Sequence, residues 1–192
     1  MQWYAAFEVA RVKLLAAAGV RAAVGQFSTG TPDVTNATII QAFYPALAAV
    51  QAAGGVLTLH EYDSPYLWQC FSNASGVGWM MGRYRQLYDT YLTPAGLGDV
   101  PLVVSEAGID DSPCGSPNLG GWQAYCSYWQ GAGWGDDCSH SYVWQLAWYD
   151  SLLRADDYVL GATIFCYQCA GFGSYDVTPM LPELAAYMTA AA

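Results

Sequence analysis

The sequence has few positive charges. Six Lys and Arg residues stand against sixteen Asp and Glu residues in a chain of 192, which gives a formal net charge of -10. DNA and RNA are polyanions, so a surface of this sign repels them and nucleic acid is excluded as a partner. Although 54% of the residues are hydrophobic, no unbroken apolar run reaches the ~20 residues of a membrane-spanning helix. We therefore expect one globular domain, residues 1–192, that does not enter a membrane.

Two motifs are also absent. No Gly-x-Gly-x-x-Gly loop follows an apolar segment, which argues against a dinucleotide-binding fold, and we expect no cofactor. No basic stretch followed by an apolar segment opens the chain, because Met1 is followed directly by Gln-Trp-Tyr and a helical pattern. A secretory signal peptide is thus not visible, and we expect the natural start to lie upstream.

The cysteine and tryptophan content favours an extracellular protein. Six Cys and eight Trp residues accompany very few lysines, and oxidising compartments are where disulfides persist. Two N-glycosylation sequons, which begin at Asn36 and Asn73, point to the same compartment. We expect a secreted glycoprotein whose cysteines are all oxidised, although the sequence does not assign their pairing.

A metal site is the alternative use of these cysteines. Cys114, Cys126 and Cys138 are evenly spaced and His140 follows them, but this group lacks the close Cys-x-x-Cys pair of a typical zinc site. The segment 166–169 has the form Cys-x-x-Cys, yet it follows an apolar run and does not open a helix as a thioredoxin motif would. We favour disulfides and expect no metal site.

Apolar segments of two kinds alternate along the chain. Apolar residues at helical spacing predict helices at residues 3–18, 39–50, 79–91, 142–154 and 181–188. Near-continuous apolar runs predict strands at residues 20–27, 56–62, 100–105 and 159–166. Pro45 is expected to kink the second helix. Strands that are apolar throughout and separated by helices are typical of a parallel sheet covered by helices, so we expect an α/β fold.

The number of strands predicts an incomplete barrel. Polar and aromatic residues crowd the carboxyl ends of several expected strands, as in (β/α)-barrel enzymes, and a doubly wound sheet is the alternative. A complete barrel needs about 250 residues, so we expect about four to five of its eight units here, completed by upstream sequence or by another chain. Residues 110–141 interrupt the rhythm and hold three Cys and three Trp. We expect them to form an inserted, disulfide-braced lobe over the barrel mouth.

Ionisable residues follow two of the expected strands. His60, Glu61 and Tyr62 end one strand, and Glu106 follows the next. A carboxylate beside a strand rich in valine is costly to bury unless it has a partner or a task. For a lone Glu we would favour a structural role, as a helix cap or an ion-pair partner.

Three features, in this order, resemble the carboxy-terminal half of the clan A (β/α)8-barrel glycoside hydrolases. They are His60-x-Tyr62 at one strand end, Ser-Glu-Ala-Gly around Glu106 at the next, and the aromatic Phe-Cys-Tyr segment that ends at Tyr167. In that clan these features follow the sixth, seventh and eighth barrel strands. The resemblance covers most of the chain apart from the inserted lobe.

The resemblance implies a retaining glycoside hydrolase that acts on a β-linked polysaccharide, such as a cell-wall glucan. Glu106 would be the nucleophile that attacks the anomeric carbon. Tyr62 would donate a hydrogen bond to Glu106, and His60 would shape the site or contact sugar hydroxyls. These three residues are our candidate catalytic group.

The clan's general acid has no counterpart here. It is a Glu that follows an Asn at the end of the fourth strand, and no Asn-Glu pair occurs in this chain. Glu61 is a candidate contact to the sugar and a weaker candidate for the missing acid, although strand alternation turns it toward the helices unless the strand has already ended. We therefore expect this chain alone to be a poor catalyst.

Other residues are candidates for substrate binding. The clan expects a Trp where Tyr167 or Gln168 stands, and a tyrosine ring can still stack on a sugar. Gln26 and Phe27, at the first strand end, are expected to line the site. Trp122 is a candidate stacking platform in the lobe, with packing of the lobe as an equally weighted alternative.

Two other functions stay open. The aromatic cleft could bind carbohydrate without cleaving it, which sugar binding without turnover would reveal. The chain could also be a truncated gene product with no function of its own, for which an exposed apolar sheet edge and poor solubility would be the signs.

Overall fold

The structure is a computed structural model that describes residues 1–72 and 77–191. The sequon at Asn73 lies outside the described residues. The other sequon begins at Asn36, whose side chain accepts a hydrogen bond from the backbone N–H of Ile39 at 3.2 Å. Asn36 thereby caps the amino terminus of the short helix α2 (Ala37–Gln41).

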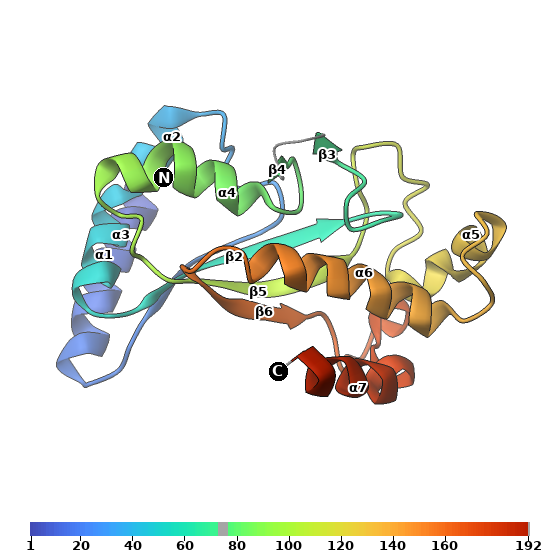
Figure 1. The fold of residues 1–192 in the computed structure, drawn as a ribbon. Coiled ribbons are helices and arrows are strands. Elements are labelled where there is room, and N and C mark those ends of the chain that lie inside the picture. Colours follow the sequence, from blue (N-terminus) through green and yellow to red (C-terminus); the bar gives the residue numbers. More distant parts are fainter. Residues whose placement is uncertain (73–76, 192) are drawn as a thin grey trace.

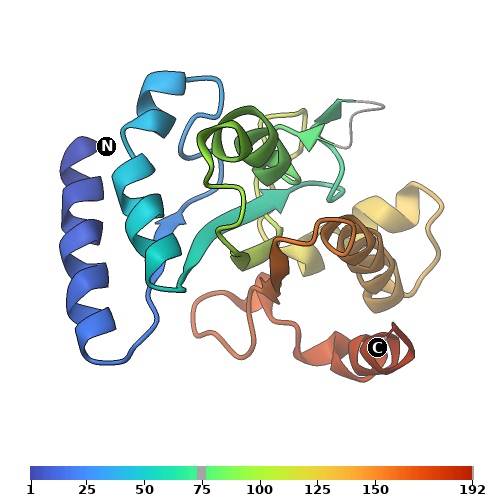
Figure 2. The ribbon, with the colours of Figure 1, turned by 60° about the vertical axis from the view of Figure 1, so that its left-hand side comes forward.

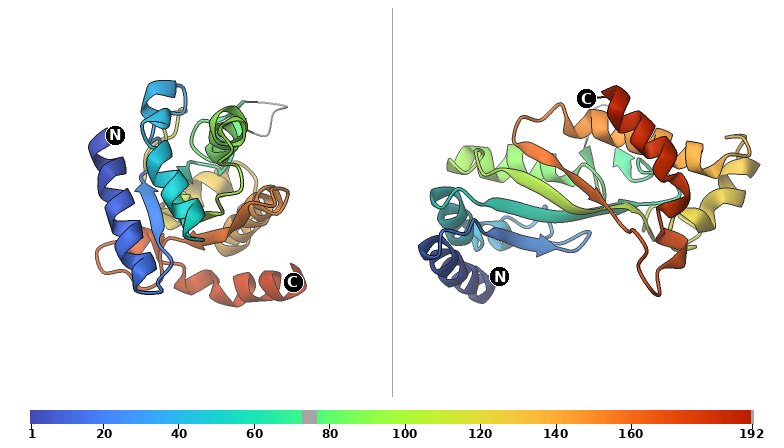
Figure 3. Two further views of the ribbon diagram at one scale, coloured as in Figure 1. Left: turned by 90° about the vertical axis from the view of Figure 1, so that its left-hand side faces the viewer. Right: turned by 90° about the horizontal axis from the view of Figure 1, so that it is seen from below.

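Four strands form one parallel sheet. Their bounds are β1 (Ala23–Phe27), β2 (Val56–Asp63), β5 (Leu102–Ile109) and β6 (Val159–Ile164). They pair in the order β1-β2-β5-β6, so each strand lies beside the one before it in the chain (Figures 1 and 3). Within these strands the order does not reverse as it does in a doubly wound sheet, and it matches consecutive strands of a (β/α) barrel.

Helices connect the strands and cover one face of the sheet. Besides α2 they are α1 (Gln2–Ala17), α3 (Tyr44–Ala52), α4 (Arg83–Leu87), α6 (Cys138–Leu153) and α7 (Leu181–Ala191). Figure 2 shows α1, α3, α4, α6 and α7 in chain order along an arc. The predicted α/β fold, with parallel strands alternating with helices, is confirmed.

The core lies between the sheet and this arc of helices. Leu57 and Leu59 of β2 and Val104 of β5 are each 2% exposed or less. Burial of one such side chain contributes about 1.5–3 kcal/mol, so this interface dominates the stability of the fold. On the edge strand β6, Leu160 is 65% exposed.

Two of the predicted helices have different bounds. The predicted helix at 39–50 is divided into α2 and α3, and Pro45 stands in the first turn of α3, where its missing N–H costs no helical hydrogen bond. Pro45 therefore starts a helix rather than kinking one.

The predicted helix at 79–91 begins only at Arg83. Gly82 precedes it with φ at +71°, and a Cβ there would lie 2.9 Å from the Phe71 ring, so the position requires glycine. After α4 the chain continues through a π-helical turn, Tyr88–Leu92.

The third predicted strand is longer than expected. It was predicted to end at Ser105, but β5 continues to Ile109. The extension pairs with β2 on one side as far as Asp63, and with β6 on the other side at Ala107. Glu106 therefore lies within a strand that has neighbours on both sides, which fixes the direction of its side chain.

The inserted lobe between β5 and α6 is held by two disulfides. It contains the short helix α5 (Cys126–Gly131). Cys126 is bonded to Cys138, and Cys114 is bonded to Cys70 in the loop that follows β2. The second bond ties the lobe to the segment that carries the hairpin of β3 (Phe71–Ser72) and β4 (Val77–Gly78).

The lobe is shorter than the predicted range, 110–141, by one helical turn. Helix α6 starts at Cys138 rather than at Tyr142, because Asp137 caps it by accepting a hydrogen bond from the backbone N–H of His140 at 3.0 Å. Residues 138–141 carry no strongly apolar side chain at helical spacing, so the sequence does not predict this first turn of α6.

The expectation that all cysteines are oxidised is corrected by the structure. Cys166 and Cys169 carry free thiols, and Cys166 is buried. Burial, followed by a hydrogen bond with Cys169, raises the pKa of the Cys166 thiol to about 11.

Within the described part of the chain, no helix is long and apolar enough to cross a membrane.

We predict that the unreduced protein, unfolded in denaturant, takes up two alkylating groups per chain and that the reduced protein takes up six. The reason is that only Cys166 and Cys169 are outside the disulfides. Intact mass spectrometry measures the count, and peptide mapping identifies the modified positions. Uptake of six groups without reductant, or of none, would contradict the disulfide assignment.

Candidate active site

A cavity of about 480 Å³ opens at the carboxyl ends of the strands. It lies on the face of the sheet that the helices do not cover. Its lining residues come from segments that follow or end all four strands: Ser28, Thr29, His60, Tyr62, Glu106, Asp110, Phe165, Phe172 and Tyr175. The three candidate catalytic residues thus share one cavity.

Glu106 is held by two side chains of the neighbouring strand. The Tyr62 hydroxyl donates a hydrogen bond to Glu106 Oε2 at 2.9 Å, and His60 Nδ1 lies 3.3 Å from the same oxygen. His60 and Tyr62 are two residues apart on β2 and point to the same face, and His60 pairs in register with Glu106. The Glu106 side chain is 37% exposed, so it is both anchored and open to the cavity.

Tyr62 acts as a fixed hydrogen-bond donor. Its ring is 7% exposed and lies edge-to-face with Phe165 at a centroid distance of 6.3 Å. Burial, together with the hydrogen bond to Glu106, raises the pKa of Tyr62 far above its ordinary value. The hydroxyl therefore stays protonated throughout the physiological pH range and continues to donate a hydrogen bond to the carboxylate.

Glu61 does not reach this cavity. It is 0% exposed and points to the opposite face of β2, where it accepts hydrogen bonds from the N–H groups of Gly82 (2.8 Å) and Tyr84 (3.2 Å) and from the Tyr149 hydroxyl (2.7 Å). Burial raises the pKa of Glu61, and these donors oppose the rise. Because β2 continues to Asp63, the side chains of Glu61 and Tyr62 still point to opposite faces of the sheet. Glu61 is therefore no longer a candidate contact to the substrate.

A second carboxylate, Asp110, lines the cavity with Glu106. It directly follows β5, and its Oδ1 accepts a hydrogen bond from the Tyr175 hydroxyl at 2.5 Å. Burial, followed by this hydrogen bond, raises the pKa of Tyr175 well above its ordinary value. Tyr175 therefore remains a donor and fixes the orientation of Asp110.

The residues predicted at the first strand end do not line the cavity. Phe27 is 7% exposed and packs edge-to-face against Phe43 at 5.0 Å, so it belongs to the core. Gln26 is exposed at an irregularity of β1, with φ at +46° and its N–H donated to Thr58 Oγ1. Ser28 and Thr29, one and two residues beyond Phe27, line the cavity instead.

Three other predicted substrate contacts lie elsewhere. Trp122 is 2% exposed and stacks on Tyr142 at 5.2 Å, so the packing alternative holds for this residue. Tyr167 is 58% exposed, and the Gln168 N–H donates to Asp176 Oδ1 at 3.1 Å, but neither residue lines the cavity.

The aromatic side chains of the cavity were missed by the sequence analysis. Phe165 lines it in place of Tyr167, although both belong to the aromatic segment that was singled out after the last strand. Phe172 and Tyr175 come from the turn that follows, and each packs against Phe165 at a right angle, at 5.1 and 5.7 Å. Asp110 follows β5 directly only because the strand continues to Ile109, so the strand limits expected from the sequence did not indicate it.

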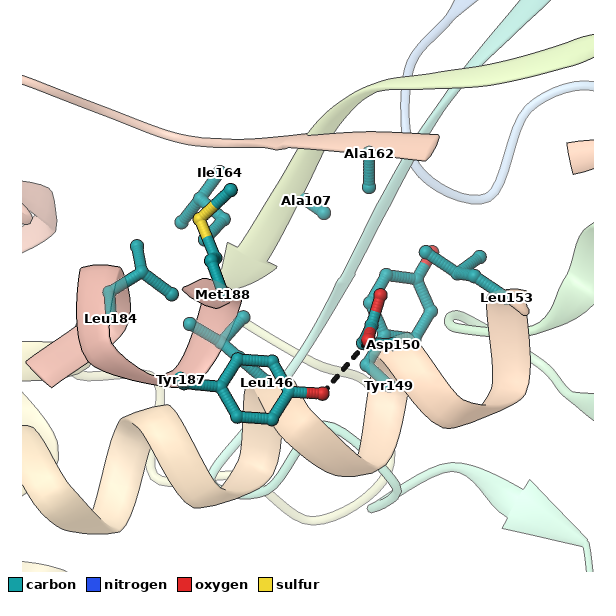
Figure 4. A pocket seen from close by; sticks show the side chains of 10 residues that line it. All are labelled: Ala107, Leu146, Tyr149, Asp150, Leu153, Ala162, Ile164, Leu184, Tyr187 and Met188. Atoms are coloured by element: carbon teal, nitrogen blue, oxygen red, sulfur yellow. Dashed lines mark hydrogen bonds between the residues drawn. The ribbon is translucent and has the colours of Figure 1, made fainter. Parts of the chain in front are cut away.

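A second, more enclosed pocket lies behind the sheet (Figure 4). It measures about 130 Å³ and lies between α6, α7 and the outward-facing residues of β5 and β6, including Ala107 and Ala162. Its walls are mostly aliphatic, and the hydrogen bond from the Tyr187 hydroxyl to Asp150 Oδ2 at 2.8 Å spans α7 and α6. Ala107 faces this pocket while its neighbour Glu106 faces the cavity, so the two spaces are separated by the sheet.

Metal ligation is not supported by any side-chain cluster in the described residues. No group of three or more His, Cys, Asp or Glu side chains there is placed to hold an ion. Cys114, Cys126 and Cys138 are all consumed by disulfides. His140 Nδ1 instead lies 2.6 Å from Glu183 Oε1, between α6 and α7.

Comparison with protein-family models, with curated proteins and with solved structures found no match to this chain.

We predict that the neighbouring carboxylates Glu61 and Glu106 differ sharply in their effect on stability. Glu61→Ala leaves three buried donors without their acceptor, at about 1–3 kcal/mol each, so the free energy of unfolding should fall by about 3 kcal/mol or more. Glu106→Ala, the matched control, removes a partly exposed side chain and should change stability by less than about 1 kcal/mol. Urea unfolding measures both, and equal losses would contradict the facing assigned to β2.

Proposed function

We propose that this chain is the carboxy-terminal half of a secreted (β/α)8-barrel glycoside hydrolase that cleaves a β-linked polysaccharide with retention of anomeric configuration. The observation that carries the proposal is the placement of Glu106 in a cavity at the carboxyl ends of parallel strands, hydrogen-bonded to Tyr62 of the preceding strand. Barrel enzymes place their chemistry at this end of the sheet.

The geometry suits a nucleophilic carboxylate. Tyr62 and His60 both meet Oε2, which leaves Oε1 to attack the anomeric carbon. The C1–Oε1 bond forms as the bond from C1 to the leaving oxygen breaks, and the bonding electron pair departs with that oxygen. As the Glu106 negative charge is transferred to the leaving group, Tyr62 keeps the carboxylate in a single orientation.

The remaining lining residues suit a neutral sugar. Asp110, oriented by Tyr175, can accept hydrogen bonds from sugar hydroxyls. Phe165 and Phe172 offer ring surface for the apolar C–H face of a pyranose. Asp110 already accepts the Tyr175 hydroxyl, so it stands in the cavity as an oriented hydrogen-bond acceptor for sugar hydroxyls.

The upstream half of the barrel would supply the general acid. Support for such a half comes from the open boundaries of the fold: β1 and β6 are edge strands, and Trp3, Phe7 and Leu14 are 79%, 48% and 74% exposed on α1. These three residues recur at helical spacing and form an apolar stripe of the kind that a preceding helix covers. Two disulfides support secretion.

The second candidate function is carbohydrate binding without catalysis. The position of Asp110 favours it, because the second carboxylate of the cavity is already hydrogen-bonded to Tyr175 and is oriented to accept hydrogen bonds from sugar hydroxyls. A chain that binds polysaccharide and never forms a covalent adduct would support this candidate.

We predict that an activated β-aryl glycoside forms a covalent adduct on Glu106 while polysaccharide is left nearly uncut. An aryl oxide leaves without a proton, whereas a sugar alkoxide needs an acid. Hydrolysis of the adduct also needs a general base to activate water, so the adduct should accumulate. Intact mass and peptide mapping detect it. Robust polysaccharide cleavage by this chain alone would contradict the missing-acid account.

We predict that Tyr62→Phe slows formation of this adduct about tenfold or more and that Glu106→Gln abolishes it. Loss of a preorganised hydrogen bond to a reacting group typically costs a factor of this size or larger. Tyr167→Phe is the matched control, because it removes a tyrosine hydroxyl outside the cavity. An unchanged rate in Tyr62→Phe would show that the contact with Glu106 is structural only.

A further inference from the structure

A third hollow lies between α6 and the loop that joins α5 to α6. It measures about 470 Å³ and is lined by Gly133, Trp134, His140, Ser141 and Trp144. None of these residues lines the cavity that holds Glu106. The Trp144 side chain is 55% exposed, which is a large apolar area to leave in water on a helix where Tyr142 and Tyr149 are buried and Trp148 is partly buried.

The walls of this hollow are two indole rings at a right angle. The centroids of Trp134 and Trp144 are 5.3 Å apart and the ring planes are 83° apart. Trp134 is backed by Tyr66, on which it stacks at 4.9 Å, and by Trp68, on which it stacks at 5.8 Å. The Trp68 ring also supports Trp144 edgewise at 5.6 Å.

The two tryptophans are held rigidly before any ligand arrives. Trp144 is on α6, and Trp134 is on the loop that joins α5 to α6. The disulfide between Cys126 and Cys138 joins the first residue of α5 to the first residue of α6 and so encloses that loop. A ring whose rotation is already restricted loses little entropy on binding, so such a surface gains affinity from preorganisation.

The polar edge of the hollow selects a neutral, hydroxyl-bearing ligand. His140 Nδ1 lies 2.6 Å from Glu183 Oε1, which leaves Nε2 on the opposite edge of its ring for a hydroxyl. No Lys or Arg is among the lining residues, and the chain carries a formal net charge of -10, so an anionic ligand would be repelled. A β-linked pyranose presents C–H faces to indole rings and hydroxyls around its rim.

We propose that Trp134, Trp144 and His140 form a second, non-catalytic binding site for a neutral β-linked polysaccharide. We call these three residues the indole platform. The identity of the polymer rests on the proposed function, but binding at the platform requires no chemistry at Glu106. The platform would hold one stretch of the polymer while another stretch of it enters the cavity.

Affinity electrophoresis of Glu106→Gln tests the proposal, because this background cannot cleave the probe. Native gels that contain barley β-glucan or laminarin should retard the protein. Trp144→Ala should weaken the apparent affinity roughly tenfold, or about 1.4 kcal/mol, and Trp144→Phe should restore part of it. Trp3→Ala is the matched control: Trp3 is 79% exposed on α1, at the opposite end of the molecule from α5 (Figure 1), and its loss should change nothing.

The outcomes separate the platform from the proposed function. Retardation by neither polysaccharide, or equal retardation of Glu106→Gln with and without Trp144→Ala, overturns the platform even if Glu106 forms an adduct. Retardation that depends on Trp144 supports the platform even if no adduct forms. Sedimentation without sugar is run in parallel, and a dimer that Trp144→Ala dissociates would identify the hollow as a contact between copies and overturn sugar binding.

Discussion

Side-chain alternation along β2, together with an irregularity of β5 at Ser105, decides which side chains reach the cavity. Glu61 and Tyr62 are adjacent, yet one is fully buried against the helices and the other lines the cavity. On the next strand the register shifts between Val104 and Glu106, so Glu106 faces the cavity although Val104 packs in the core, and Ala107 lines the pocket beneath α6 and α7. Alternation on β2 and this irregularity on β5 thus give the carboxylates of two neighbouring strands opposite roles. Glu61 joins the sheet to α4 and α6, and Glu106 remains available for chemistry.

The sequence predicts the order of elements well because that order depends on local periodicity. All four strands were placed, and the meeting of His60, Tyr62 and Glu106 follows from the rule that parallel strands deliver their carboxyl ends to one edge. The limits of β5 were not predictable in this way. Its extension to Ile109 depends on pairing with β2 and β6 across a long sequence separation.

The substrate contacts were the least predictable part of the site. Phe27 and Phe165 are both aromatic residues at strand ends, but Phe27 packs on Phe43 and only Phe165 turns into the cavity. Trp122 and Trp144 are both tryptophans of the lobe region, but one is buried and the other is half exposed. Residue type predicts that such a ring can bind a sugar, and only tertiary packing decides whether its face is available.

We propose that Glu106 is the nucleophile of a double displacement. Azide provides the most direct test, because it can displace the Glu106 ester without a general base: the C1–Oε1 bond breaks, a C1–N bond forms and the carboxylate is regenerated. Proton NMR of the product from a β-aryl glycoside reports the configuration. We expect a β-glycosyl azide whose formation requires Glu106. An α-glycosyl azide from the native chain, or undiminished β product from Glu106→Gln, would contradict it.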